Sequence, residues 1–372
     1  MKDPRSTRIA LFNANLARGE AGALIRELET ADSPQVAAVA EIVQRVRPDI
    51  LVLNELDHDP QGRAMSLFRS ALTTGRGGAR GIDYPHTFSA PINTGLRSGH
   101  DLDGDGSTHG PADAQGWGLF PGQFGMAVLS TARITHGHSF RTLLWRDAPG
   151  AELPTQPNGS AFYPDGAEDV LRLSSKSHWV LATGGLTLLI AHPTPPVFDG
   201  PEDRNGLRNA AEIGLLTTLV DGETFVPDDR GELVQLPGKT PLVVVGDLNN
   251  DPLDGDGRHE AIASLLAHPR LRDPLQSSDG AMAASTTQGG INNAHLSDPR
   301  YDTADWKDNG KNTPGNLRVD YVLPSRDLRI TGSGVFWPTP EDPLHRLVGT
   351  GRPIISSDHR LVWVDIIVHS RD

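Results

Sequence analysis

The stretch that decides the fold is Pro241-Leu-Val-Val-Val-Gly-Asp-Leu-Asn-Asn250. Its first half suits a buried β-strand, and that strand leads directly to Asp247 and Asn249. Side chains two apart on a strand point to one face, so the carboxylate and the amide can converge on one bound group. Open sheets tend to place their chemistry at strand ends. Taken alone, the same residues also fit an Asx turn that closes a strand.

Other strand-like runs carry the same kinds of side chain, a carboxylate, an amide or an imidazole, at an end or within the run. These are Asn13 and Asn15 ending 8–15, Glu55 ending 49–55, His192 after 186–191, Asp320 within 317–323, and Asp358 with His359 before 360–368. The repeated pattern is typical of a divalent-metal hydrolase. Oxygen ligands suit Mg²⁺, Mn²⁺ or Ca²⁺, and the absence of Cys excludes thiolate zinc sites.

Taken in chain order, these motifs resemble the endonuclease/exonuclease/phosphatase superfamily, which includes DNase I-like nucleases, apurinic endonucleases, inositol phosphatases and sphingomyelinases. The resemblance runs from Asn13 to His359. The matching positions are the Asn of the first strand (Asn13), the metal-binding Glu (Glu55), the Gly-Asp-x-Asn signature (246–249), the Asp of the Asp-Tyr strand (Asp320) and the closing Ser-Asp-His (357–359). His192 falls where several members keep a phosphate-contacting His.

The chain departs from the superfamily pattern at two positions. Asn54 stands where many members have Gln before the Glu, which barely affects the metal argument. Asn15 stands where some members place a second acidic ligand, so the resemblance supports one catalytic metal better than two.

The resemblance implies an α/β (α+β) fold, a DNase I-like four-layer α/β/β/α sandwich with two packed mixed sheets flanked by helices. A length of 372 residues would suggest two domains, but the motifs come from both ends and must meet. We therefore expect one domain, 1–372, with long loop insertions at about 74–123, 146–170 and 275–316. Such loops are usually functional, and we expect them to select the substrate.

Periodicity predicts the main elements between these loops. Ser33 and Pro34 have the residue types of a helix N-cap and first turn, and Pro48 closes that helix. The expected helices are 34–47, 60–72, 204–220 and 258–267, and the further expected strands are 124–130 and the hairpin 177–183 with 186–191.

The resemblance also implies roles for the motif residues. Glu55 is the firmest metal ligand, with Asn13 and Asp358 as neighbours and Asn15 as a weaker candidate. The metal is expected to be Mg²⁺ or Mn²⁺, and magnesium uses few protein carboxylates. Asp247 is expected to orient and deprotonate the attacking water.

The remaining motif residues would act on the phosphoryl group. Asn249 would hold water or a phosphate oxygen, and His192 would present an imidazole to the phosphate. Asp320 and His359 are expected to pair, leaving an imidazolium that stabilises charge on the phosphoryl oxygens. In some relatives the same His is the base instead, and the sequence leaves both roles open.

Two peripheral groups are weaker candidates. Arg204 and Arg208 lie four apart on one helical face and could reach an anionic substrate, or could equally face solvent. Asp101, Asp103 and Asp105, followed by a glycine, copy the first half of a calcium loop. The usual twelfth-position Glu is missing and Asp113 stands one residue later, so a structural Ca²⁺ site and a plain acidic turn both remain open.

Composition limits the partners. The formal net charge is −13, with 34 Lys and Arg against 47 Asp and Glu, and no basic stripe is evident. This balance argues against tight nucleic-acid binding, although bound cations can reverse a local field. No apolar run approaches membrane-spanning length and no signal peptide is recognisable. An extracellular or periplasmic location is weakly favoured by the resemblance, with a cytoplasmic one as the alternative, and no protein partner is evident.

The sequence therefore predicts a divalent-metal-dependent phosphoester hydrolase that activates water for in-line attack at phosphorus. A small phosphomonoester or phosphodiester is the favoured substrate because of the acidic balance. The first alternative is a secreted nuclease that cleaves DNA or RNA. The second is a binding module without catalysis on the same scaffold, since a fold does not guarantee chemistry.

Overall fold

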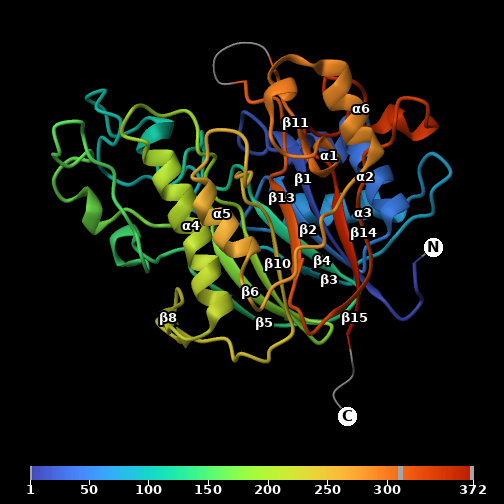
Figure 1. Cartoon of the computed structure of the whole chain (residues 1–372), viewed down its shortest axis with the longest axis horizontal. Coiled ribbons are helices and arrows are strands. Elements are labelled where there is room, and N and C mark those ends of the chain that lie inside the picture. The colour runs from blue at the N-terminus through green and yellow to red at the C-terminus, as the bar shows by residue number, and fades with distance from the viewer. Residues whose placement is uncertain (1, 309–312, 369–372) are drawn as a thin grey trace.

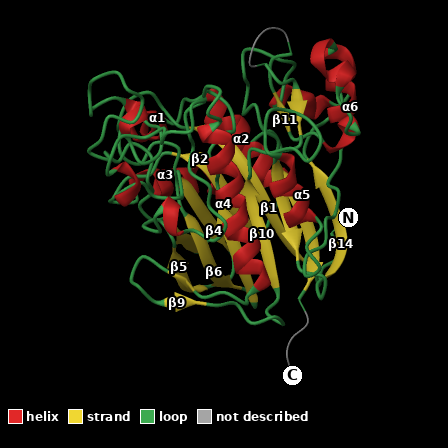
Figure 2. Ribbon diagram, turned by 60° about the vertical axis from the view of Figure 1, so that its left-hand side comes forward, coloured by secondary structure: helices red, strands yellow, loops and turns green. Residues whose placement is uncertain are grey.

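The computed structural model describes residues 2–308 and 313–368 (Figure 1). Positions 309–312 of the loop expected at 275–316, and both extremities of the expected domain, lie outside this described part. Two large mixed sheets form the centre of the molecule, and helices cover both outer faces (Figures 1 and 2).

The first sheet has six strands. In spatial order they are β14 (Arg329–Val335), β15 (Val362–Ile367), β1 (Thr7–Leu16), β2 (Ile50–Leu56), β4 (Met126–Ser130) and β3 (His86–Phe88). The pair β1 and β2 is parallel, and the other neighbours are antiparallel. Because β1 lies between β2 and β15, segments from opposite ends of the sequence are adjacent in this sheet.

The second sheet has five strands. They are β13 (Asp320–Pro324), β10 (Leu242–Asp247), β7 (Leu186–Ala191), β6 (His178–Thr183) and β5 (Ile134–Ser139). Here β10 and β7 are parallel, whereas β6 and β7 form the hairpin that the sequence predicted. Two short pairs, β8 (Val226–Pro227) with β9 (Leu233–Val234) and β11 (Ala304–Asp305) with β12 (Asn316–Leu317), lie outside these sheets.

Alternation along the strands explains why the two sheets stack. Val243 and Val245 of β10 belong to the core that includes the apolar side chains of the first sheet. Leu242 and Val244, one residue out of phase, pack instead in the core of the outer helices α4 (Arg204–Asp221) and α5 (His259–Leu266). A period of two thus gives each sheet two buried faces.

The opposite outer face carries a second group of helices: α1 (Ala23–Thr30), α2 (Pro34–Val46) and α3 (Arg63–Thr73). The expected four-layer α/β/β/α arrangement is confirmed. The N-cap prediction for α2 is also confirmed, because the Ser33 side chain accepts a hydrogen bond from Val36 N and Pro34 opens the helix. None of the helices in the described ranges has the length and apolarity needed to cross a bilayer.

The loop regions contain more structure than the sequence indicated. The segment 275–316, expected to be irregular, contains α6 (Asp279–Gln288), which Ser278 caps through Ala281 N. The helix escaped prediction because its sequence is mostly Ala, Ser and Thr, with little apolar periodicity. Short 3₁₀ turns occur at Pro111–Asp113, Trp145–Asp147, Ala167–Asp169, Gly290–Ala294, Pro299–Tyr301 and Pro343–Leu347. Helix α1 and strands β3, β5 and β14 were likewise not predicted.

Candidate active site

The predicted strand ends meet at one edge of the sandwich. Asp247, which ends β10, pairs in register with Asp320, which begins the adjacent strand β13. In the other sheet, Asn13 of β1 lies opposite Asn54 of β2, one residue before Glu55. The sheets face each other, so both sets of side chains reach a shared space.

Asn13 links the two sheets. Its Nδ2 donates hydrogen bonds to Glu55 Oε1 at 3.2 Å and to Asp247 Oδ2 at 2.9 Å. Its Oδ1 accepts from the backbone N–H of Asn15 at 3.2 Å. In this arrangement Asn13 holds the two carboxylates at a fixed separation, in addition to the ligand role that the resemblance suggested.

Asp247 lies at the centre of the cluster and is 1% exposed. Its Oδ2 is 3.5 Å from His192 Nε2 and 3.7 Å from His359 Nε2, while Oδ1 accepts from Asn249 N at 3.0 Å. Burial would raise the pKa of Asp247, but His359 and His192 outweigh that effect and hold the pKa below its ordinary value. Asp247 is therefore ionised at neutral pH and can accept a hydrogen bond from water.

Asp320 and His359 form the predicted pair. His359 Nδ1 is 2.9 Å from Asp320 Oδ2, and Trp306 packs edge-on against the imidazole ring. Burial would lower the pKa of His359, but Asp320 and Asp247 raise it well above its ordinary value. Burial raises the pKa of Asp320 to about 6, with His359 opposing and Asp247 adding to that increase. Since the ring faces two carboxylates, we assign the proton to His359.

The position of His359 is fixed through its backbone. Its N–H donates to Ser357 Oγ at 3.0 Å, and that hydroxyl donates to Asn13 O at 2.7 Å. The Ser357 hydroxyl thus anchors the Ser-Asp-His segment to β1, which is a structural role for the serine of the motif.

His192 differs from His359 in charge. Burial, and then the nearby Lys176 ammonium, lower the pKa of His192 to about 4, against the opposing effect of Asp247. The ring is neutral at pH 7, and its Nδ1 has no hydrogen-bond partner within the described ranges. A neutral imidazole beside Asp247 can donate a hydrogen bond without adding charge.

Glu55 is partly buried and occupies a strained position. Its φ of 60° lies in the left-handed region, as do those of Asn15 at 49° and Asn249 at 52°. For a non-glycine residue this backbone costs of order 1–2 kcal/mol. Burial raises the pKa of Glu55 to about 7, with Asp358 and Asp247 adding to the increase and His359 opposing it.

These residues fit a divalent cation. The carboxylates of Asp358 and Asp247 both act on Glu55, the Asn13 amide donates to Glu55 and Asp247, and the chain has no thiolate. An oxygen-rich set of this kind suits Mg²⁺ or Mn²⁺. Binding a cation would also favour the ionised form of Glu55, which burial disfavours. The identity of the ion remains a prediction.

Helix α4 holds the loops that carry the site. Asn209 Nδ2 donates to Thr194 O at 2.8 Å and to Leu248 O at 2.9 Å. One turn later, Glu212 accepts from Thr194 N and Ser175 N, each at 2.7 Å. The loops after β7 and β10 and the segment before β6 are therefore tied to one buried helical face.

Sequence reasoning missed several of these residues. Asn54, noted only as a departure from Gln, accepts a hydrogen bond from Asp247 N at 3.0 Å and so joins the sheets through the backbone. Gly246 lets β10 approach β7, because a Cβ there would lie 2.2 Å from Ala191 O. Asn209, Glu212 and Lys176 belong to no strand-end motif, and no signal in the sequence singled them out.

The two arginines proposed as substrate contacts have different environments. Arg208 is buried and donates to the backbone carbonyls of Leu173 and Arg172, so the solvent-facing alternative was wrong, and contact with a substrate stays a prediction. The guanidinium satisfies carbonyls of the loop before β6 instead. Arg204 is partly exposed and pairs with Glu202.

The acidic loop lies away from this site in the sequence and is largely exposed. Carboxylate oxygens of Asp101, Asp103 and Asp105 lie within 4.8 Å of one another, and those of Asp101 already accept from Gly104 N and Gly106 N. Asp113 is fully buried, and its two oxygens accept from Leu102 N and Gly110 N. The structure thus gives Asp113 a role in closing the loop, and calcium binding stays a prediction.

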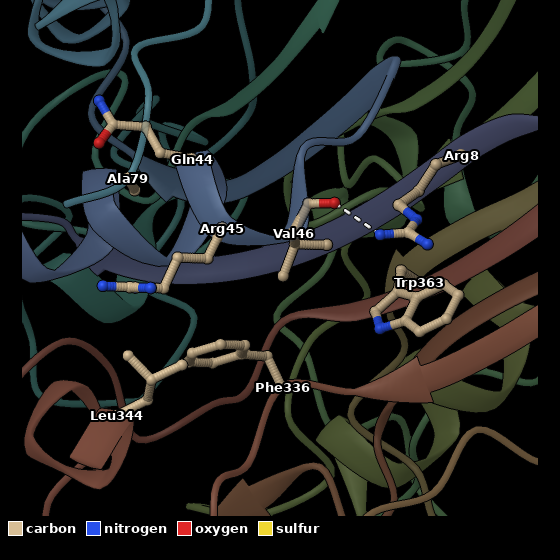
Figure 3. A pocket seen from close by; sticks show the side chains of 8 residues that line it. All are labelled: Arg8, Gln44, Arg45, Val46, Ala79, Phe336, Leu344 and Trp363. Atoms are coloured by element: carbon tan, nitrogen blue, oxygen red, sulfur yellow. Dashed lines mark hydrogen bonds between the residues drawn. The ribbon is translucent and has the colours of Figure 1, made fainter. Parts of the chain in front are cut away.

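A surface cavity at the other end of β1 does not compete as a phosphate site. It measures about 490 Å³ and is lined by Arg8, Arg45 and Trp363 among others (Figure 3). Arg8 is paired with Asp365 and donates to Val46 O, and Arg45 is paired with Glu41. Both guanidinium groups are already neutralised within the protein.

The fold and the strand-end site together define a protein of the DNase I-like α+β sandwich class. The chain belongs to the Endonuclease/Exonuclease/phosphatase family, whose model matches residues 10–359. The activities in that name are all hydrolyses of phosphate esters.

Solved structures of the same family share the fold. The endonuclease/exonuclease/phosphatase from Beutenbergia cavernae is 18% identical, with a TM-score of 0.50, and the alignment covers 98% of this chain and 72% of that one. The family protein from Leptotrichia buccalis is 13% identical, with a TM-score of 0.50 and coverage of 97% and 99%. No curated protein sequence matches.

Proposed function

We propose that this protein is a divalent-metal-dependent phosphoester hydrolase that activates water for in-line attack at phosphorus. The observation that carries the proposal is the surroundings of Asp247. One ionised, buried carboxylate lies beside a neutral imidazole, a protonated imidazole and the Asn13 amide. A carboxylate that accepts a proton thus lies next to groups that donate hydrogen bonds. This combination suits a reaction in which a proton moves while negative charge develops on oxygen.

Each side chain then has a role. Asp247 accepts the proton of the attacking water and orients it, because it remains ionised at neutral pH. His359, kept protonated by Asp320 and Asp247, donates a hydrogen bond to the phosphoryl oxygens as they gain charge. His192 and Asn249 hold the phosphoryl group or the water in line. The raised pKa of His359 supports this assignment over one in which the ring is the base.

Glu55 and Asp358 would hold the cation, with Asn13 and Asn15 beside them. When bound, a divalent ion supplies Lewis-acid polarisation of a phosphoryl oxygen. Asn13 keeps Glu55 in position on one side and Asp247 on the other, so the ligand and the base stay at a fixed separation.

The substrate we favour is a small phosphomonoester or phosphodiester. The net charge of −13 opposes wide contact with a nucleic-acid backbone, which normally requires a basic face. A secreted nuclease on DNA or RNA is the alternative that the same chemistry allows.

The test is hydrolysis of p-nitrophenyl phosphate and bis-p-nitrophenyl phosphate with Mg²⁺ or Mn²⁺, and then with EDTA. Plasmid DNA and RNA are assayed in parallel over a range of salt concentrations. We expect turnover of a small ester that EDTA abolishes and that Asp247→Ala removes. Activity unchanged in EDTA would contradict the metal requirement, and steeply salt-dependent DNA cleavage would favour the nuclease. Wild-type protein that binds phosphate but hydrolyses none of these substrates would indicate a binding module.

A further inference from the structure

Lys176 places a buried cation beside the candidate active site. It lies just before β6 and is 6% exposed. Its Nζ donates one long hydrogen bond, 3.4 Å, to Pro193 O, the carbonyl that also accepts from Asn249 Nδ2 at 3.1 Å. Lys176 and Asn249 therefore approach the same point, immediately after His192.

The cation lacks a close anionic partner within residues 2–308 and 313–368. No carboxylate oxygen there lies within 4.0 Å of Lys176 Nζ, although Glu212, Glu55 and Asp247 are near enough to oppose the lowering of its pKa by burial. An ammonium group has three donors, and one long bond leaves two of them free. A buried charge normally has a paired anion, because desolvation is otherwise costly.

The fold holds this lysine in place. Its carbonyl accepts from Asn93 N at 3.0 Å, and the preceding Ser175 donates to Glu212 of α4 through both its N–H and its hydroxyl. Glu212 also accepts from Thr194 N, which follows Pro193. One carboxylate thus fixes both the segment that carries Lys176 and the segment that carries His192.

We propose that Lys176 binds a non-bridging oxygen of the substrate's phosphoryl group, with Glu212 as the residue that positions it. The proposal deepens the phosphoester hydrolase function and rests on it. An ammonium binds phosphate as a point charge, and Lys176 lies next to the two side chains, His192 and Asn249, expected to contact the same group.

The experiment compares wild type with Lys176→Met and Lys176→Gln. Isothermal titration with inorganic phosphate in EDTA measures binding without metal or turnover, and kcat and KM are measured on the small ester with Mg²⁺. Lys239→Met is the matched control, because it removes a lysine from the exposed loop before β10, at the opposite end of that strand from Asp247. Thermal unfolding of all variants checks the fold.

We expect both Lys176 variants to bind phosphate about 10- to 100-fold more weakly, with a raised KM, and Lys239→Met to match wild type. Unchanged phosphate affinity and KM in the Lys176 variants would overturn the proposal while leaving the hydrolase function intact. An equal loss in Lys239→Met, or no phosphate binding by wild type, would also overturn it. Phosphate binding that depends on Lys176 in a protein that hydrolyses no ester would support the site and reject the hydrolase.

Discussion

Asn13 Nδ2 donates a 2.9 Å hydrogen bond to Asp247 Oδ2, and this bond connects two sheets through residues 234 positions apart. The same amide also binds Glu55. One side chain therefore sets the separation between the candidate metal ligand and the candidate base. This relationship makes the site sensitive to changes that leave every titratable group in place.

Asn13→Ala tests that relationship. The change leaves Glu55 and Asp247 without their shared donor, and an unsatisfied buried group costs about 1–3 kcal/mol. We expect a lower free energy of unfolding, weaker Mg²⁺ binding and reduced kcat. Chemical denaturation and Mg²⁺ titration measure the first two. Wild-type stability and metal affinity in this variant would show that the bridge has no such role.

Glu55→Gln tests the metal ligand and its electrostatics. The folded pKa of about 7 lies above the ordinary value of 4.5, so folding favours the protonated carboxyl. The contribution of Glu55 to the stability of the metal-free protein should therefore fall, by at most about 3 kcal/mol, as the pH rises from about 4.5 through 7. The variant should lack this loss, and Mg²⁺ should no longer raise its Tm. If Mg²⁺ still raised the Tm of the variant, Glu55 would not be a metal ligand.

Asp320→Asn tests the charge on His359. Asp320 and Asp247 raise the pKa of the ring, so an essential imidazolium makes activity fall when the pH rises through that pKa. Without the Asp320 carboxylate the pKa of His359 should drop, and the falling limb of the kcat profile should move to lower pH. A profile that instead rises with pH through this range would identify the ring as the base.

Asp302 provides a stability test outside the site. It is 1% exposed, and burial together with Asp251, Asp254 and Asp298 raises its pKa to about 8. Because the folded pKa exceeds the ordinary value of 3.8, the contribution of Asp302 to stability should be fully present below pH 3.8 and should be lost as the pH rises through about 8.

Asp302→Asn should therefore be more stable than wild type by a few kcal/mol at pH 8 and above, and similar at pH 4. Urea denaturation at several pH values measures this difference. If the free energy of unfolding changed with pH in the same way in both proteins, ionisation of Asp302 would not destabilise the fold.

The sequence by itself determined the strands that carry the candidate site and the side chains near their ends. The continuous apolar run Leu242–Val245 and the polar residues that follow it are local properties. Strands β10, β1 and β2, and the identities of Asp247, Asn13 and Glu55, could therefore be predicted from such runs. Helix α6 could not, because its Ala, Ser and Thr residues bury only a small face and leave no periodic signal.

Only the tertiary structure decided how the motif residues are supported. Lys176 and Glu212 lie near the site because α4 packs across the loops of the second sheet, which is a long-range contact without a local pattern. Packing also made Arg208 a buried carbonyl partner, although its helical spacing allowed a surface role. Local sequence encodes local geometry, whereas burial and charge at a site depend on segments that meet only when the two sheets stack.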